Sequence, residues 1–288
     1  MYEEYLFLST NLKAKFPKFI DKAQWEWLKN ANLTDLLDWL KETSYAFISE
    51  IGYQEIVRIL TEDLKLISKT VKSPYIEIML FDLMVHDVRN LIEGIEISGK
   101  REVFYGLPYS PYFGDLKKEI LNRLTKIWQE TKDLRMLNLF VDVAALNLSK
   151  EFLEDLESEK VKNFWKLRNN LYLIKVLLRI KKINISPEIL KKIDLPKTDP
   201  EELVNSLGKP YIEFLKEVEN EDIDLLIKKY LFNFMRKNFK NVVSGPEVVL
   251  YYFYNKLWEM EDLLTLIESK RNKIPNQIWE KGLLKIND

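Results

Sequence analysis

Residues 251–267 read YYFYNKLWEMEDLLTLI, a long apolar run that is interrupted by Asn255, Glu259 and Asp262. Two earlier segments have the same character: residues 81–94 read FDLMVHDVRNLIEG, and residues 164–179 read FWKLRNNLYLIKVLLR. Each predicts a long apolar helix with a notch of polar side chains and a basic tail after it. The fold class follows from these three segments.

Helical periodicity extends outward from these segments to most of the chain. Leucines at 33, 36, 37 and 40 follow the i, i+3, i+4, i+7 spacing of one buried helix face, and residues 223–234 show the same pattern. Gly (8 residues) and Pro (10 residues) are too scarce for an all-β sandwich or a glycine-rich dinucleotide fold. The sequence therefore predicts an all-α protein.

Helix starts are marked in the sequence. Asp199-Pro200-Glu201-Glu202 places a capping Asp, a Pro at the first helical position and a Glu three residues after the cap. The stretch Ser244-Gly245-Pro246-Glu247 repeats this order. We expect helices to begin at Pro200 and Pro246.

Breaks near residues 99–114 and 183–200, where Gly and Pro gather, divide the chain into thirds. Each third ends in one of the three long helices and holds an earlier amphipathic helix, at 33–40, 137–156 and 203–218. This order predicts a degenerate threefold repeat. We expect three similar helical-bundle lobes, at 1–99, 100–195 and 196–288, in a pseudo-threefold, funnel-like arrangement.

Composition narrows the function classes. Lys+Arg 44 against Asp+Glu 45 gives a net charge of −1, without the basic excess typical of nucleic-acid binding. The absence of Cys excludes disulfides, Cys-ligated metal centres and thiol nucleophiles. No uninterrupted apolar run approaches the about 20 residues that span a bilayer, and the acidic start does not resemble a signal peptide. We expect a cytoplasmic protein that meets a membrane only through a partner.

Patterns of enzyme chemistry are missing. His86 is the single histidine, which is too few for a helical di-metal site, and we expect it to be structural. No phosphate-binding loop occurs, since Gly99-Lys100-Arg101 and Gly208-Lys209-Pro210 both lack its pattern. We expect no catalytic residues, no cofactor and no metal.

The polar notches are the candidate functional feature. Asp82, His86, Asn90 and Glu93 lie on one face of a helix by their spacing. One interpretation is an ordinary solvated face, and the other is a shared polar cavity in which the three notches receive a partner. The candidate partner-socket residues are Asp82, His86, Asp87, Arg89, Asn90, Lys166, Asn170, Asn255, Glu259 and Asp262.

The aromatic run at 251–254 fits either core packing or an interface, and we expect it in the core.

The segments together resemble the C-type subunit of the A/V-type (archaeal/vacuolar-type) rotary ATPases, the equivalent of the d-type subunit of the vacuolar ATPase. Four stretches carry the resemblance: the start that ends LTDLLDWLKETSY at Tyr45; Asp87-Val88-Arg89-Asn90-Leu91; Asp142 within LFVDVAALNL; and Gly245-Pro246-Glu247 followed by Glu259, Lys270, Asn272 and Pro275-x-x-Ile278. Leu167, Asp262 and Ser269 depart from the family's pattern.

The resemblance implies a non-catalytic central-stalk subunit of an A/V-type ATPase or ATP synthase. Such a subunit is a three-lobed helical socket between the rotating shaft, made of D-type and F-type subunits, and the membrane rotor ring of proteolipid subunits. It serves proton or sodium transport and lies peripheral to the membrane as part of the complex.

Two alternatives remain open. A free-standing α-solenoid scaffold or adaptor is expected to repeat every 34 to 47 residues, whereas the repeat here is about twice as long. An all-α prenyl-transfer enzyme is expected to carry an Asp-Asp-x-x-Asp cluster, which does not occur.

Overall fold

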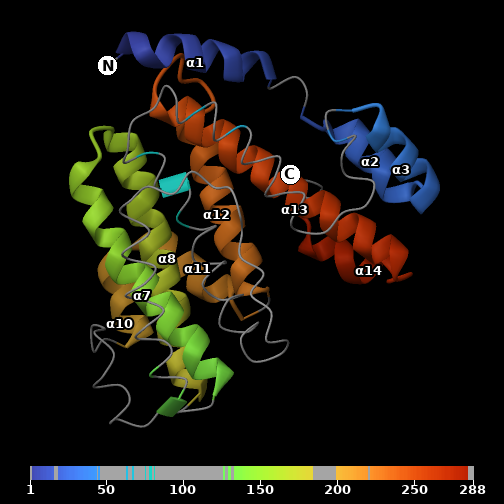
Figure 1. The fold of residues 1–288 in the computed structure, drawn as a ribbon. Coiled ribbons are helices and arrows are strands. Elements are labelled where there is room, and N and C mark those ends of the chain that lie inside the picture. Colours follow the sequence, from blue (N-terminus) through green and yellow to red (C-terminus); the bar gives the residue numbers. More distant parts are fainter. Residues whose placement is uncertain are drawn as a thin grey trace. The chain divides into compact units, whose positions relative to one another are not determined.

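The structure is a computed structural model of the chain, which describes residues 2–15, 19–43, 45, 63, 67, 75, 78–79, 81, 126, 129–130, 133–183, 199–219 and 221–284. Within these residues every regular element is helical and no strand occurs, so the all-α prediction is confirmed (Figure 1).

The chain divides into two compact units. Unit 1 comprises residues 1–72 and 228–288, and unit 2 comprises residues 73–227. Both expected lobe boundaries, at 99/100 and 195/196, lie outside the described residues, so the three-lobe division and its funnel-like arrangement stay predictions.

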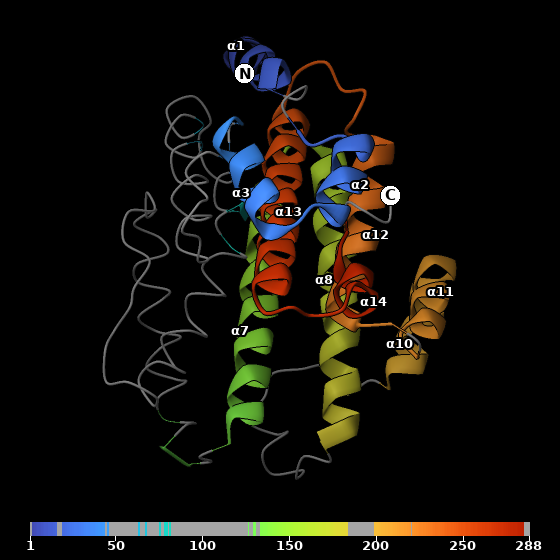
Figure 2. The same ribbon diagram turned by 90° about the vertical axis from the view of Figure 1, so that its right-hand side faces the viewer.

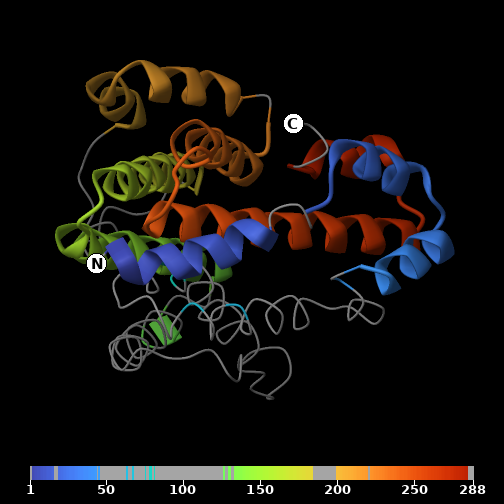
Figure 3. The same ribbon diagram turned by 90° about the horizontal axis from the view of Figure 1, so that it is seen from above.

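Unit 1 is built on the longest described helix. Its helices are α1 (Tyr2–Lys15), α2 (Lys22–Asn30), α3 (Leu33–Lys41), α13 (Pro246–Arg271) and α14 (Asn276–Trp279), with the short 3₁₀ helix η3 (Glu280–Gly282) and the later part of α12 (Ile223–Asn238). Helix α1 runs along α13 (Figure 3), and α2 and α3 flank α13 (Figure 2).

The helix starts of unit 1 follow from capping side chains. Asp21 accepts a hydrogen bond from the Gln24 backbone at 2.8 Å, and the Gln24 side chain accepts one from the Asp21 backbone, which forms a capping box for α2. Asn32 caps α3 through the Asp35 backbone. These caps fix where the short helices begin.

Helix α13 begins at Pro246, as predicted, but without a side-chain cap. Its N-cap is Gly245, with φ 130°, and Ser244 Oγ is buried without a partner among the described residues. This φ is one that residues other than glycine rarely adopt, so the backbone requires glycine at this position. The predicted capping order is correct for the helix start and wrong for the role of Ser244.

Unit 2 contains α7 (Leu134–Asp155), α8 (Glu159–Ile183), α10 (Pro200–Leu207) and α11 (Lys209–Glu217). Helices α7 and α8 form a hairpin (Figure 1) whose connection is held by Tyr75, since its hydroxyl accepts backbone N–H bonds from Glu157 at 3.1 Å and Ser158 at 3.0 Å. Asp199 caps α10 through the Glu201 backbone, as the sequence predicts.

The helix expected at 203–218 is two helices. Gly208 lies between α10 and α11 with φ 94° and ψ −169°, a conformation essentially restricted to glycine. Pro210 follows in the first turn of α11, where its missing N–H costs nothing. The periodicity is right on both sides of Gly208, whereas the expectation of one continuous helix is wrong.

The hydrophobic core of unit 2 contains a buried guanidinium. Arg168 is 3 % exposed, and its guanidinium carbon lies 4.5 Å from the ring centre of Trp165 and 4.4 Å from that of Tyr172. Phe81 meets Trp165 edge to face at 5.6 Å. Cation–π contacts therefore surround this charge inside an aromatic cluster.

Candidate functional site

The polar notch of α13 is buried. Asn255, Glu259 and Asp262 are 4 %, 0 % and 5 % exposed, and they lie at i, i+4 and i+7 on one helix. Tyr252, Phe253 and Tyr254 are also buried, which confirms the predicted core position of most of the aromatic run. The notch is thus a row of polar groups inside unit 1, which we call the α13 polar row.

Glu259 binds two residues of the N-terminal segment. Its Oε2 accepts the backbone N–H of Ile20 at 2.9 Å, and its Oε1 accepts the hydroxyl of Tyr45. Ile20 precedes α2 and Tyr45 follows α3, so one carboxylate fastens both ends of the α2–α3 segment to α13. Burial, reinforced by the charge of Glu259, raises the pKa of the Tyr45 hydroxyl well above its usual value, so that this hydroxyl remains a donor.

The other two members of the row bind within unit 1 as well. Asn255 donates to the carbonyl oxygen of Tyr251 at 2.6 Å. Asp262 accepts the backbone N–H of Leu284 at 3.2 Å, so it holds the chain beyond α14. The row therefore connects α13 with segments from both ends of the sequence.

A second polar cluster joins α1 to α13 through Asp63. This carboxylate, 8 % exposed, accepts from Lys15 Nζ at 2.8 Å, Lys256 Nζ at 2.5 Å and the Tyr252 hydroxyl at 2.9 Å. Burial alone would raise the pKa of Asp63, but the charges and hydrogen bonds of Lys256 and Lys15 outweigh it and hold that pKa below its usual value. Burial and the charge of Asp63 also raise the pKa of Tyr252.

Lys270 links the C-terminal end of α13 to the end of α2. Its ammonium donates to the carbonyl oxygens of Lys29 at 2.9 Å and Ala31 at 2.5 Å, at the end of α2. Burial lowers the pKa of Lys270, against the opposing charge of Glu280. An ammonium bound to two carbonyls at a helix C-terminus is electrostatically favourable.

In unit 2 the predicted residues of α8 are more accessible. Lys166 is exposed, and Asn170 is half-buried and donates to the Tyr211 hydroxyl of α11 at 3.0 Å.

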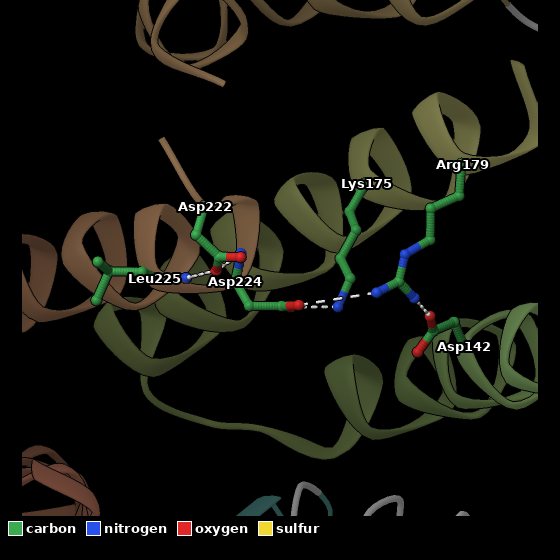
Figure 4. Close-up of polar contacts among 6 residues, drawn as sticks. All are labelled: Asp142, Lys175, Arg179, Asp222, Asp224 and Leu225. Atoms are coloured by element: carbon green, nitrogen blue, oxygen red, sulfur yellow. Dashed lines mark hydrogen bonds and ion pairs between the residues drawn. The ribbon is translucent and has the colours of Figure 1, made fainter. Parts of the chain in front are cut away.

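The same helix carries a charge network that links α7, α8 and α12 (Figure 4). Lys175, whose side chain is 2 % exposed, pairs with Asp224, and Arg179 pairs with Asp142 at 2.5 Å and with Asp224 at 3.7 Å. Asp224 stands in the first turn of α12, which Asp222 caps by accepting the backbone N–H groups of Asp224 and Leu225 at 3.0 Å. The buried Lys175 of α8 and the buried Asp142 of α7 therefore each have a partner of opposite charge.

Comparison with known families decides the identity of the chain. The family model described as "ATP synthase (C/AC39) subunit" matches residues 8–281. The chain belongs to the ATP synthase (C/AC39) subunit family. It is therefore a subunit of a rotary ATPase or ATP synthase complex, and the resemblance inferred from the sequence is confirmed. No curated protein matches the sequence significantly.

Several residues that carried the resemblance to the C/AC39 family make internal contacts in the structure. Tyr45 contacts Glu259, Lys270 contacts the end of α2, and Asp142 pairs with Arg179. The motif positions thus coincide with contacts that hold each unit together.

The first-lobe candidates Asp82, His86, Asp87, Arg89 and Asn90 lie outside the described residues. Their place in a socket stays a prediction, as does that of the other candidates.

Sequence reasoning missed the Asp63 cluster and the partners of Lys175 and Asp142. Asp63, Lys15 and Asp224 lie among many charged residues, and no periodicity distinguishes them. Lys256, Lys175 and Asp142 carried a usable signal, because each is a charge within an apolar helix that must find a partner.

Within the described residues, no group of His, Asp and Glu side chains could hold a metal ion. None of the described helices is both long and apolar enough to cross a membrane.

Proposed function

We propose that this chain is the non-catalytic central-stalk subunit of an A/V-type rotary ATPase or ATP synthase. In this role it is a socket that couples the rotating shaft, of D-type and F-type subunits, to the proteolipid rotor ring. It lies on the cytoplasmic side, peripheral to the membrane, and contributes no nucleotide site of its own.

The observation that carries this proposal is the family match over residues 8–281. The contacts of α13 support it physically. A part that transmits torque must resist deformation, and α13 is tied to both ends of the chain through Glu259, Asp262 and Lys270. Buried, hydrogen-bonded polar groups favour one arrangement, because another arrangement would leave them unsatisfied.

The candidate residues then take two roles. Asn255, Glu259 and Asp262 are buried and bonded within the chain, so we assign them to positioning the wall of the socket. Lys166 and Asn170, which are accessible on α8, are assigned with Asp82, His86, Asp87, Arg89 and Asn90 to contacts with a partner.

The test is reconstitution with purified shaft subunits and rotor ring from the same organism. We expect one copy of the chain to co-elute with the shaft and with the detergent-solubilised ring in size-exclusion chromatography. Lys166→Glu is expected to weaken one of these complexes, while Lys216→Glu, an exposed lysine of α11, serves as its control. A chain that stays monomeric with both partners would contradict the proposal and favour the alternative, a free-standing scaffold or adaptor.

A further inference from the structure

Helices α2 and α3 form a hairpin, residues 21–42, that lies beside α13 in unit 1 (Figure 2). Side chains of the hairpin itself complete its two helices, since Asp21 caps α2 and Asn32 caps α3. The rings of Trp27 and Trp39, one from each helix, lie 6.3 Å apart. A segment with its own caps and its own contacts can keep its helices when its attachment to the rest of the unit is lost.

The described polar attachments of the hairpin to α13 lie at its two ends. At the base, the carboxylate of Glu259 binds the residues that precede α2 and follow α3. At the tip, the ammonium of Lys270 binds the carbonyl oxygens of Lys29 and Ala31, in the connection between the two helices. Two side chains of α13 therefore hold both ends of the hairpin.

The tip is the end of the hairpin that water reaches. Glu259 at the base is fully buried, whereas Lys270 at the tip is half-buried. A second contact at the tip, Lys29 with Glu280 at 3.2 Å, joins side chains that are 24 % and 26 % exposed. Water can replace the partners of these groups, so the contacts at the tip are released more readily than those at the base.

The attached hairpin buries a donor without an acceptor. Trp25 is 2 % exposed, and its indole N–H has no acceptor among the described residues. Leu28, Leu36 and Leu40 complete the buried apolar face of the hairpin. This apolar face favours attachment, but the indole N–H opposes it, because the group gains a water partner when the hairpin detaches.

Helix α1 is attached to α13 by a different set of residues. Lys15 of α1 and Lys256 of α13 both bind Asp63, and the Ser9 hydroxyl of α1 accepts the backbone N–H of Gly245 at 3.3 Å. These contacts do not involve the hairpin, so α1 can stay on α13 when the hairpin leaves.

We infer that the α2–α3 hairpin is a flap that detaches from α13 and reattaches as one unit, held at its tip by Lys270, while α1 stays bound to α13. Detachment exposes the apolar face formed by Trp25, Leu28, Leu36 and Leu40. The chain then has a second state, with a surface that the first state buries, and such a pair of states is a means of regulation. The inference concerns the chain by itself and does not depend on the proposed function.

Thiol labelling tests the inference, because the chain has no cysteine of its own. Leu28→Cys reports on the hairpin and Leu263→Cys on α13, and both leucines are 0 % exposed. Without denaturant, we expect the thiol at position 28 to be labelled at least about tenfold faster than the thiol at position 263, because the flap opens more often than the whole unit unfolds. Urea titrations of both variants correct the rates for differences in global stability.

Further substitutions in the Leu28→Cys chain identify the contacts that opening breaks. Lys270→Met removes bonds that the detached hairpin no longer makes, so we expect labelling to become about tenfold faster. Asp63→Asn weakens a contact that the open state retains, so we expect a lower urea midpoint but a labelling rate within about twofold. If Lys270→Met does not fold, Lys29→Gln removes only the ion pair with Glu280 and is expected to speed labelling about twofold to threefold.

Three results would overturn the inference. Equal corrected rates at positions 28 and 263 would show that the hairpin opens only when the whole unit unfolds. Labelling that the tip substitutions leave unchanged would show that Lys270 and Lys29 do not hold the flap. Acceleration by Asp63→Asn equal to that by the tip substitution would show that α1 leaves together with the hairpin.

Discussion

Glu259 shows how a single residue can organise a unit. Its two carboxylate oxygens receive donors from before α2 and after α3, and the side chain is completely buried. A buried carboxylate without these donors would be strongly unfavourable, so its partners and its position require one another.

Glu259→Gln keeps the size of the side chain but removes its charge and replaces one acceptor oxygen by an amide donor, so the two charge-assisted hydrogen bonds from Ile20 and Tyr45 cannot both be kept. We expect the free energy of unfolding to fall by about 1–3 kcal/mol in urea titrations. Glu213→Gln, at an exposed surface pair with Lys209, is the control, with a change within about 0.5 kcal/mol. Equal midpoints for the two variants would show that the Glu259 bonds contribute little.

Lys273, whose φ is 54°, gives a second prediction at the residue scale, in which the substitution is expected to raise the free energy of unfolding. Because glycine adopts positive φ without steric cost, Lys273→Gly is expected to stabilise the isolated chain by about 0.5–1 kcal/mol. Thermal and urea unfolding measure this, with Lys240→Gly, at an exposed lysine of another helix-terminal turn, as the control. A destabilisation would mean that the lysine side chain makes a stabilising contact in solution.

At the scale of elements, one residue separates two helices and another links two helices. Gly208 separates α10 from α11, and Asp63 joins α1 to α13. The first effect is local and conformational, whereas the second depends on charges from three separate parts of the sequence.

Gly208→Ala tests the local effect. A Cβ meets no atom within 4 Å there, but φ 94° is strained for any L-residue, so we expect a loss of about 1–3 kcal/mol. Gly282→Ala also meets no atom within 4 Å, lacks that backbone restriction and is the matched control. Urea unfolding measures the free energy of unfolding of both variants. Similar losses of stability in the two would contradict the assignment of the effect to the backbone conformation of Gly208.

Asp63→Asn tests the link between α1 and α13. The pKa of Asp63 is lowered in the folded state, so its stabilisation is present above the unfolded pKa near 4 and is lost as the pH falls below it. We expect Asp63→Asn to cost about 2–4 kcal/mol at pH 7, and this cost to decrease as the pH is lowered to 3 and the carboxylate becomes protonated. Urea titrations at both values measure the difference; a cost independent of pH would rule out the charge as its origin.

At the scale of the whole molecule, each unit is held by polar contacts of its own. Glu259 fastens α2, α3 and α13 in unit 1, whereas Asp142 and Arg179 fasten α7 and α8 in unit 2. Local opening is governed by such contacts within a cooperative unit.

Native-state hydrogen exchange tests whether each set of contacts governs opening within its own unit. Glu259→Gln is expected to speed exchange in α2 and α3, and Asp142→Asn in α7 and α8, with each variant as the control for the other. Equal acceleration in all four helices by either substitution would show that the chain opens as one unit.

Features that depend on neighbouring residues could be predicted from the sequence alone. Periodicity placed α3, α8, α12 and α13, Asp199 and Pro200 fixed the start of α10, and most of the aromatic run was correctly predicted to be buried. The partners of the buried polar residues, in contrast, became known only from the packed structure. Glu259 meets partners 239 and 214 positions away, and Asp63 meets Lys256 193 positions away. Helix formation is local, whereas the pairing of buried charges depends on how distant helices pack.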